Sequence, residues 1–193
     1  EIGGEPMVAR VIDTAQQLEP QSTVVVIGHG KEKVRERVAR NVAWVEQTEQ
    51  LGTGHAVKVA LPHLPAEGRT LVLYGDVPLI RRDTLANLLT QVDEQHMGLL
   101  TVTLDDPSGY VRIVRDSDGQ AVAIVEQKDA NDEQLSITEC NTGIMAMTSA
   151  QLKRWLPQLS AENAQGEYYL TDVIAMAASE GIQVATAQPH DAT

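Results

Sequence analysis

Short apolar runs that end near a glycine and alternate with helical patterns constrain the fold of this 193-residue chain most strongly. Residues 23–28 and 70–75 are two such runs. Continuous apolar runs of this length are typical of strands buried on both faces of a sheet. Residues 31–40 and 84–95 carry apolar side chains at helical spacing. This alternation predicts βαβ units and an α/β fold with a mostly parallel sheet.

The pattern changes after Asp105. Residues 111–115 and 121–125 are apolar runs on either side of Asp116-Ser117-Asp118-Gly119, a turn signal, and they predict an antiparallel hairpin inserted into the fold. Such a hairpin is placed to cover a ligand site, with Glu126 at its returning end. We find no interdomain linker, so residues 1–193 are expected to form a single domain.

Composition excludes several classes of function. Aromatic residues make up only 3% of the chain, which argues against single-strand nucleic-acid binding by base stacking. The formal net charge of -12 also disfavours nucleic acid and anionic membranes as partners. Cys140 is the one cysteine, so no internal disulfide can form, and we expect a cytoplasmic protein in which this thiol is a buried strand residue.

Asp76 follows an apolar run and a glycine, at the point where ligands bind in open α/β sheets. A carboxylate there suits a hard cation such as Mg²⁺ that carries phosphates. Ordinary turn chemistry is the alternative explanation of Gly75-Asp76.

The polar loop at residues 47–54 contains Gly52-Thr53-Gly54 and leads into a helix expected over residues 56–61. Glycines there let backbone amides approach the anionic or carbonyl oxygens of a ligand. A plain turn explains the two glycines equally well. His55 opens the helix, and we expect it to support this loop structurally.

Six segments follow one another in a characteristic order: residues 49–56, 73–79, 105–113, 125–130, 141–144 and 165–172. They read EQLGTGHA, LYGDVPL, DDPSGYVRI, VEQKDA, NTGI and QGEYYLTD. Together they resemble the sugar-1-phosphate nucleotidyltransferases, in particular the uridyltransferase domain of the bacterial bifunctional enzyme that makes UDP-N-acetylglucosamine. The resemblance spans nearly the whole chain. It implies a Rossmann-like, three-layer nucleotide-diphospho-sugar transferase fold.

The resemblance implies transfer of a uridylyl group from UTP to N-acetylglucosamine-1-phosphate, with Mg²⁺ as cofactor. Asp76 would be the catalytic residue, because it binds the metal ion. The remaining substrate contacts implied by the family are Gln47, Gly52 and Thr53 for uracil, Tyr74, Gly75 and Asp76 for the nucleotide and sugar, Val111 beside the substrate, and Glu126 and Asn141 for the sugar hydroxyls.

Two departures from the family pattern bear on activity. The family's N-terminal Gly-rich segment and lysine, which hold the triphosphate, and its downstream asparagine, a second metal ligand, have no match in this sequence. We therefore expect UDP-N-acetylglucosamine binding to survive better than turnover. Val111 stands where the family has glycine, so the loop is either extended at this point or strained or crowded by the valine.

Two other functions fit the same residues. One is transfer to another sugar phosphate or from another nucleotide such as dTTP, and the other is a non-catalytic module that binds nucleotide sugars. The family's homotrimer is expected only in the full-length protein, because the hexapeptide repeats of the C-terminal domain are absent from this sequence.

Overall fold

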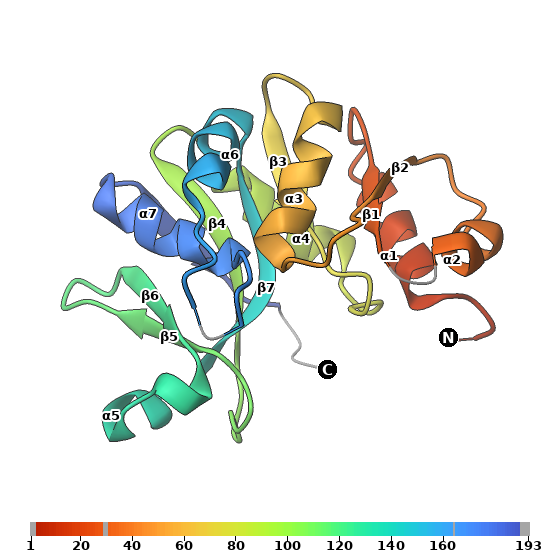
Figure 1. The fold of residues 1–193 in the computed structure, drawn as a ribbon. Coiled ribbons are helices and arrows are strands. Elements are labelled where there is room, and N and C mark those ends of the chain that lie inside the picture. Colours follow the sequence, from red (N-terminus) through yellow and green to blue (C-terminus); the bar gives the residue numbers. More distant parts are fainter. Residues whose placement is uncertain (1–2, 29–30, 164, 190–193) are drawn as a thin grey trace.

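A computed structural model of the chain describes residues 3–28, 31–163 and 165–189, and shows an α/β fold (Figure 1). The strands are β1 (Val24–Ile27), β2 (Ala43–Glu46), β3 (Arg69–Val72), β4 (His96–Thr103), β5 (Arg112–Arg115), β6 (Ala121–Val125), β7 (Glu139–Thr148) and β8 (Gln183–Ala187). The α-helices are α1 (Met7–Gln16), α2 (Lys31–Arg37), α3 (Thr53–Ala60), α4 (Arg82–Thr90), α5 (Asp132–Leu135), α6 (Ser149–Trp155) and α7 (Val173–Ser179). Short 3-10 turns add Leu61–His63, Gln127–Asp129, Leu156–Gln158 and Leu170–Asp172.

The strands form two sheets. β1 and β2 make a parallel two-stranded sheet, and the other six strands make a sheet in the order β6-β5-β7-β4-β8 with β3 also paired to β7. β3, β4 and β5 are each antiparallel to β7, and β8 is parallel to β4. These four strands therefore point the same way, as predicted. Only β6 and β7 run in the opposite direction, and the central position of β7 makes most neighbouring pairs antiparallel.

The long strand β7 organises the large sheet. β4 pairs along one edge of β7, from Glu139 to Ala146. β3 pairs with residues 145–148 and β5 with Cys140, so these two strands share the other edge of β7 at its opposite ends. Residues 141–143 of β7 thus lie in a gap between the end of β3 and the start of β5. The candidate site forms at this gap.

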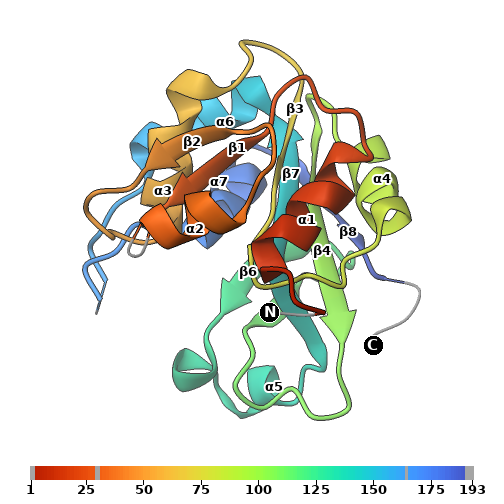
Figure 2. The ribbon, with the colours of Figure 1, turned by 90° about the vertical axis from the view of Figure 1, so that its right-hand side faces the viewer.

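Helices cover both faces of the large sheet (Figure 2). On one face, α3, α6 and α7 bury Val57, Trp155 and Ile174 against strand residues such as Met145. On the other face, α4 buries Leu85 and Leu88 against Leu100, Ile144 and Ala146. α1 contributes Ala9 and Ile12 to a third cluster with the two-stranded sheet. This is the three-layer arrangement that the sequence predicts.

The local predictions are largely confirmed. Every predicted strand and helix named above occurs, with ends that differ by a few residues, and the hairpin of β5 and β6 turns at Asp116–Gly119. One predicted boundary was wrong, because α3 begins at Thr53 rather than at Ala56. Within the described residues, none of the helices has the length and apolar character needed to cross a membrane.

Candidate functional site

The gap on β7 brings together residues from three segments. The Tyr74 ring lies against the backbone of Gly143, so close that a Cβ at Gly143 would meet Cε2 of Tyr74 at 2.7 Å. Gly143 has φ 82°, so it is required both for its backbone conformation and for this approach. The Asn141 amide donates to the carbonyl of Val111 at 2.9 Å, which extends the pairing of β5 with β7. Tyr74, Asn141 and Val111 therefore lie at one place, as the sequence predicts.

The N-terminus of α3 reaches the same place. The Thr53 hydroxyl interacts with the phenol of Tyr74, and it also accepts a hydrogen bond from the Leu170 amide at 3.1 Å. Burial is the main cause that raises the pKa of Tyr74, and the negative charge of Asp76 raises it further. Tyr74 is therefore a neutral hydrogen-bonding group at neutral pH, within electrostatic range of Asp76.

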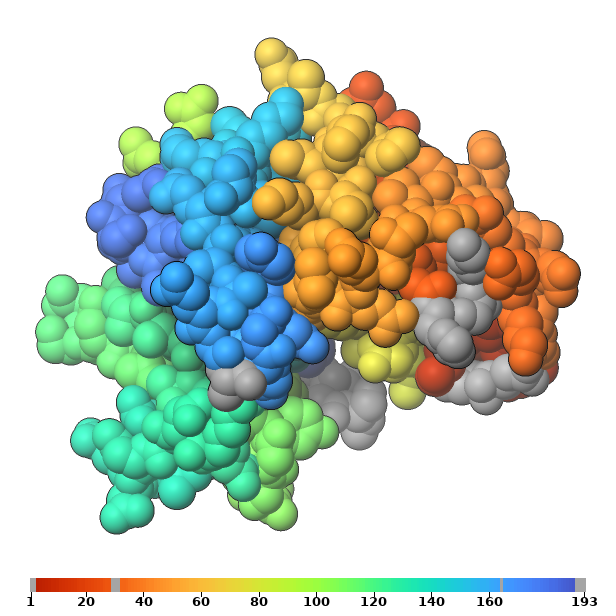
Figure 3. Space-filling model, viewed as in Figure 1, coloured from red at the N-terminus to blue at the C-terminus, as the bar shows by residue number. Residues whose placement is uncertain are grey.

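The glycines of the loop serve protein packing. Gly52 has φ 98°, and a Cβ there would meet the carbonyl oxygen of Tyr168 at 2.7 Å. A Cβ at Gly54 would meet Leu159 at 2.5 Å, and the Gly54 amide donates to the Tyr168 carbonyl at 2.8 Å. Figure 3 shows the start of α3 and the segment that contains Tyr168 side by side on one face of the molecule. The expectation that these amides serve a ligand is wrong for Gly54, whose amide is already bonded.

Gln47 lies directly after β2 and is half-buried. Its Nε2 atom donates to the Gly52 carbonyl at 3.0 Å and lies 3.0 Å from Nδ1 of His55. The His55 ring lies 6.3 Å from that of Tyr168, measured between centroids. His55 thus supports the loop, as the sequence predicts, and does so through the side chain expected to bind the base.

Glu126 follows β6 and is exposed. Burial, and then the negative charges of Glu167 and Glu126, raise the pKa of Tyr169. Glu126 is therefore close enough to the 167–169 segment to affect its electrostatics. Asn141 accepts a hydrogen bond from the Gly143 amide at 2.9 Å through Oδ1, so its Nδ2 group is left to donate. An acidic acceptor and an amide donor are the groups that sugar hydroxyls need.

Asp76 lies in the turn after β3 and is exposed. Among the described residues, no group of three or more His, Cys, Asp or Glu side chains could hold a metal ion. A single exposed carboxylate does not make a preformed protein cage for a cation. It fits an ion such as Mg²⁺ that keeps several waters and takes its other ligands from substrate phosphates.

Val111 does not strain the backbone. Among the described residues other than glycine, only Glu19 has a positive φ, so position 111 does not need the conformational freedom of glycine. Its carbonyl accepts the Asn141 amide in the strand-like manner described above. The alternative of a strained loop is therefore contradicted, and crowding of the substrate by the valine stays a prediction. Gly75 packs near α1, where a Cβ would lie 3.3 Å from Val8.

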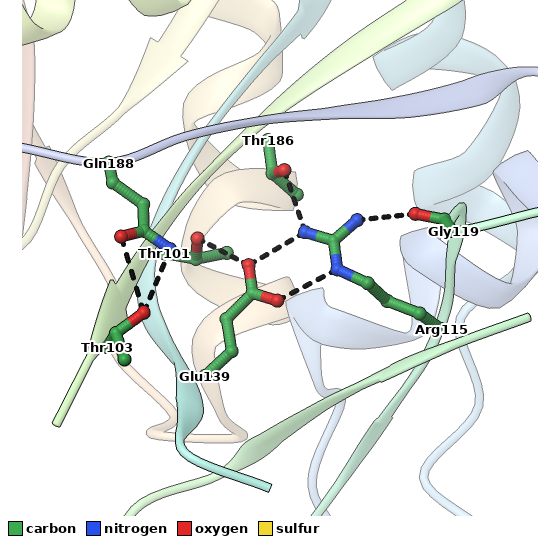
Figure 4. A network of polar contacts seen from close by, with 7 residues as sticks. All are labelled: Thr101, Thr103, Arg115, Gly119, Glu139, Thr186 and Gln188. Atoms are coloured by element: carbon green, nitrogen blue, oxygen red, sulfur yellow. Dashed lines mark hydrogen bonds and ion pairs between the residues drawn. The ribbon is translucent and has the colours of Figure 1, made fainter. Parts of the chain in front are cut away.

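Sequence reasoning missed the ion pair that fixes the hairpin to the sheet (Figure 4). Arg115 of β5 donates to both carboxylate oxygens of Glu139 on β7, at 2.8 and 2.7 Å. It also donates to the hydroxyl of Thr186 on β8 and to the carbonyl of Gly119 in the hairpin turn. The Thr101 hydroxyl of β4 donates to Glu139 at 2.7 Å. We call Arg115, Glu139, Thr101 and Thr186 the clamp.

The clamp lowers the pKa of the Glu139 carboxylate. Burial opposes ionisation of Glu139, but hydrogen bonds from Arg115 and Thr101 outweigh it, so the pKa of Glu139 lies below its usual value of 4.5. Cys140, the next residue, is buried, and burial raises the pKa of its thiol. The prediction of a buried strand cysteine is confirmed.

Comparison with known proteins gives the family. The sequence profile of the MobA-like NTP transferase domain matches residues 1–131, about two thirds of the chain. The chain belongs to the MobA-like NTP transferase family. The chain is 62% identical over 192 residues to the bifunctional protein GlmU of Chromohalobacter salexigens, and the aligned region covers 99% of the chain and 42% of that relative. The bifunctional protein GlmU of Pseudomonas putida is 60% identical over 192 residues, which again cover 99% of the chain and 42% of that relative. The chain thus spans less than half the length of these relatives.

Solved structures of distant sequence show the same fold. A UDP-glucose pyrophosphorylase complexed with UDP-glucose superposes with a TM-score of 0.74 at 16% identity, over 97% of this chain and 80% of that one. The inositol-1-phosphate CTP transferase from T. maritima superposes with a TM-score of 0.69 at 19% identity, over 94% of this chain and 72% of that one. The predicted nucleotide-diphospho-sugar transferase fold is confirmed.

Proposed function

We propose that this NTP transferase domain binds UTP and N-acetylglucosamine-1-phosphate and joins them into UDP-N-acetylglucosamine, with release of pyrophosphate. The GlmU relatives at 60–62% identity support uridylyl transfer. The observation that carries the proposal is the convergence of Thr53, Tyr74 and Asn141 at the gap on β7. These residues come from three separate motif segments, and each belongs to the set that the family resemblance implies.

The reaction needs positioning more than proton transfer. An oxygen of the sugar phosphate attacks the α-phosphorus of UTP, a new P–O bond forms, and the bond to the bridging oxygen of the β-phosphate breaks in line with it. The attacking oxygen is already ionised at neutral pH, so no general base is required. Pyrophosphate leaves with the electron pair of the broken bond.

The chain's own residues hold the two ends of the product. Gln47, Gly52 and Thr53 bind the uracil, and Tyr74 with Gly75 lies along the nucleotide. At the other end, Glu126 accepts hydrogen bonds from sugar hydroxyls, and Asn141 donates to one through Nδ2. Val111 borders the sugar.

Nucleotidyltransferases of this kind use a divalent metal ion. We assign the ion as Mg²⁺ and Asp76 as the residue that would hold it. When bound, the ion supplies positive charge that offsets the phosphates. The carboxylate of Asp76, in the turn after β3 and within electrostatic range of Tyr74, would hold that charge near the phosphates.

Two measurements on this chain test the proposal. Calorimetry with UDP-N-acetylglucosamine and MgCl₂ should show weak, saturable binding that Asp76→Asn reduces. Pyrophosphate release from UTP and N-acetylglucosamine-1-phosphate should be slow, and Asp76→Asn should lower it at least about 100-fold, because metal-borne charge stabilisation is worth several kcal/mol. The same assay with dTTP measures how strongly the site prefers uracil.

Asp105→Asn is the matched control. Asp105 is another exposed aspartate in a loop, outside the proposed site, and its loss should leave both measurements unchanged. The proposal fails if the wild-type chain does not bind UDP-N-acetylglucosamine, or if Asp76→Asn behaves like Asp105→Asn.

A further inference from the structure

The side-chain amide of Gln47 is held in one orientation. Its Nε2 atom lies 3.0 Å from the Gly52 carbonyl oxygen and 3.0 Å from Nδ1 of His55. A carbonyl oxygen only accepts hydrogen bonds, so the group of the amide that faces Gly52 is its NH₂ and not its oxygen. The same nitrogen has a second hydrogen, and the atom in reach of it is Nδ1 of His55. Both hydrogens are therefore used within the protein.

This geometry also sets the state of His55. Because Nδ1 faces the NH₂ group of Gln47, the tautomer that fits this contact carries its proton on Nε2. The ring is packed against Tyr168, with 6.3 Å between centroids and an interplanar angle of 33°. Tyr168 is itself fixed by backbone hydrogen bonds to Leu51 and Gly54, both 2.8 Å long. The acceptor that faces Gln47 is thus held by the same loop that it supports.

We propose that His55 is a positioning residue that fixes the Gln47 amide with its carbonyl oxygen turned toward the base, and so selects uracil over cytosine. In the described part of the chain, no donor is hydrogen-bonded to Oε1 of Gln47. Uracil presents a donor, N3–H, between its two carbonyl groups, whereas cytosine presents an acceptor at the same ring position. An amide that can offer only its oxygen therefore binds uracil and repels cytosine.

The inference rests on the proposed function, in which Gln47 faces the base. It adds the reason why a glutamine, whose amide can offer either a donor or an acceptor, discriminates between two pyrimidines. Without His55, the amide keeps one hydrogen bond to Gly52 and turns more easily. Reversal would place Oε1 against the Gly52 oxygen, so His55 adds a second bond against that reversal.

A pair of substitutions separates the acceptor from the ring. In His55→Asn, the side-chain oxygen takes the place of Nδ1 and the ring is lost, whereas His55→Phe keeps the ring and loses the acceptor. Calorimetry of this chain with UDP and with CDP measures the selectivity. We expect His55→Phe to lower the preference for UDP about tenfold, the effect of one hydrogen bond, and His55→Asn to keep it within about twofold. Substitutions of the exposed His63 to Phe and Asn are the controls, with thermal unfolding of every variant.

The outcomes are distinguishable. The inference is overturned if folded His55→Phe keeps the wild-type preference for UDP over CDP. It is also overturned if His55→Asn loses this preference while His55→Phe keeps it, because the ring and not the acceptor would then be responsible. Long-range ¹H–¹⁵N spectra of the wild-type imidazole test the positioning without any nucleotide. A proton on Nε2 of His55 is expected, and a proton on Nδ1 overturns the positioning even where the proposed function stands. If the wild-type chain binds UDP no better than CDP, the selectivity and the proposed use of Gln47 both fail.

Discussion

The two sides of the candidate site are held by different forces. On the nucleoside side, α3 and the 166–170 segment approach so closely that a Cβ at Gly52 or Gly54 would meet the Tyr168 carbonyl oxygen at 2.7 or 3.0 Å, and backbone hydrogen bonds join them. On the sugar side, the hairpin of β5 and β6 packs Ile113 and Ala121 into the core and is also joined to the sheet by the clamp, which is centred on the partly exposed ion pair of Arg115 and Glu139. Close packing resists changes of pH and salt, whereas an ion pair responds to both. The nucleoside side is therefore the constant part of the site, and the sugar side is the adjustable part.

The sharpest way to break the nucleoside side is Gly54→Ala. In an open helix this change would stabilise by about 1 kcal/mol, but here the new methyl meets Leu159 at 2.5 Å. We expect the free energy of unfolding to fall by about 3 kcal/mol, as in other overpacked cores, with loss of nucleotide binding. Urea denaturation measures the first effect and calorimetry the second.

Gly119→Ala on the sugar side is the control for Gly54→Ala. Gly119 has φ 78° with no atom within 4 Å of the added Cβ, so only the left-handed backbone is penalised, by about 1 kcal/mol. A loss at Gly54 no larger than the loss at Gly119 would contradict the role of close packing.

The clamp is tested by Glu139→Gln. The glutamine keeps the shape and removes the charge opposite Arg115, whose side chain is 32% exposed against 17% for Glu139. A partly buried, bidentate pair of this kind should contribute about 1–2 kcal/mol to the free energy of unfolding. We also expect weaker binding of UDP-N-acetylglucosamine with unchanged binding of UDP, because the hairpin precedes Glu126.

Asp83→Asn is the matched control for the clamp, because Asp83 pairs with Arg82 on the surface, where both side chains are more than half exposed. Its effect on stability should stay below about 0.5 kcal/mol. Equal weakening of UDP and UDP-N-acetylglucosamine in Glu139→Gln would show that the clamp does not act on the sugar side.

The two sides should also differ in their response to acid. The pKa of Glu139 is lower in the folded chain than its usual 4.5, so its ionised form favours folding at neutral pH. That contribution is present above pH 4.5 and is lost as the pH falls through the lower, folded pKa. Thermal unfolding between pH 7 and pH 3 should therefore show the wild type and Glu139→Gln becoming more alike as the pH falls. A difference in stability that does not depend on pH would contradict an electrostatic clamp.

Val111→Gly should have the smallest effect. The backbone at this position is not left-handed, so glycine removes two methyl groups and adds conformational freedom, which costs about 0.5–1 kcal/mol of stability. We expect the affinity for UDP-N-acetylglucosamine to change less than about threefold, the effect of well under 1 kcal/mol. Calorimetry that shows tenfold tighter binding would mean that the valine crowds the sugar.

Local features of the fold could be predicted from the sequence, but its long-range pairings could not. The strand at residues 70–73 and the hairpin at Asp116–Gly119 were predicted because apolar runs and turn residues are local signals. The place of β7 between β3, β4 and β5 depends on which strands pair, and the order of residues along the chain does not encode that directly. The sequence therefore predicted the direction that most strands share, but not the antiparallel pairing of their neighbours with β7.

The candidate site divides in the same way. Tyr74, Asn141 and Thr53 were found through motifs, and the structure brings them together. The role of Gly54 was misjudged, because its neighbours, Tyr168 and Leu159, lie more than 100 positions away in sequence. The pairing of Arg115 with Glu139, 24 positions apart, was missed because an arginine in a strand gives no sign of which carboxylate it will meet. Glu126 and Asp76 remain predictions as substrate and metal ligands.

The position of β7 has a consequence for how the chain is made. A ribosome synthesises β3, β4 and β5 before it reaches β7, yet each of these strands pairs with β7. The nascent chain therefore carries unpaired strand edges until about residue 148 has emerged, a state prone to aggregation and to capture by chaperones. Slow synthesis before that residue should lower the yield of native protein, whereas a pause after β8 should do little harm.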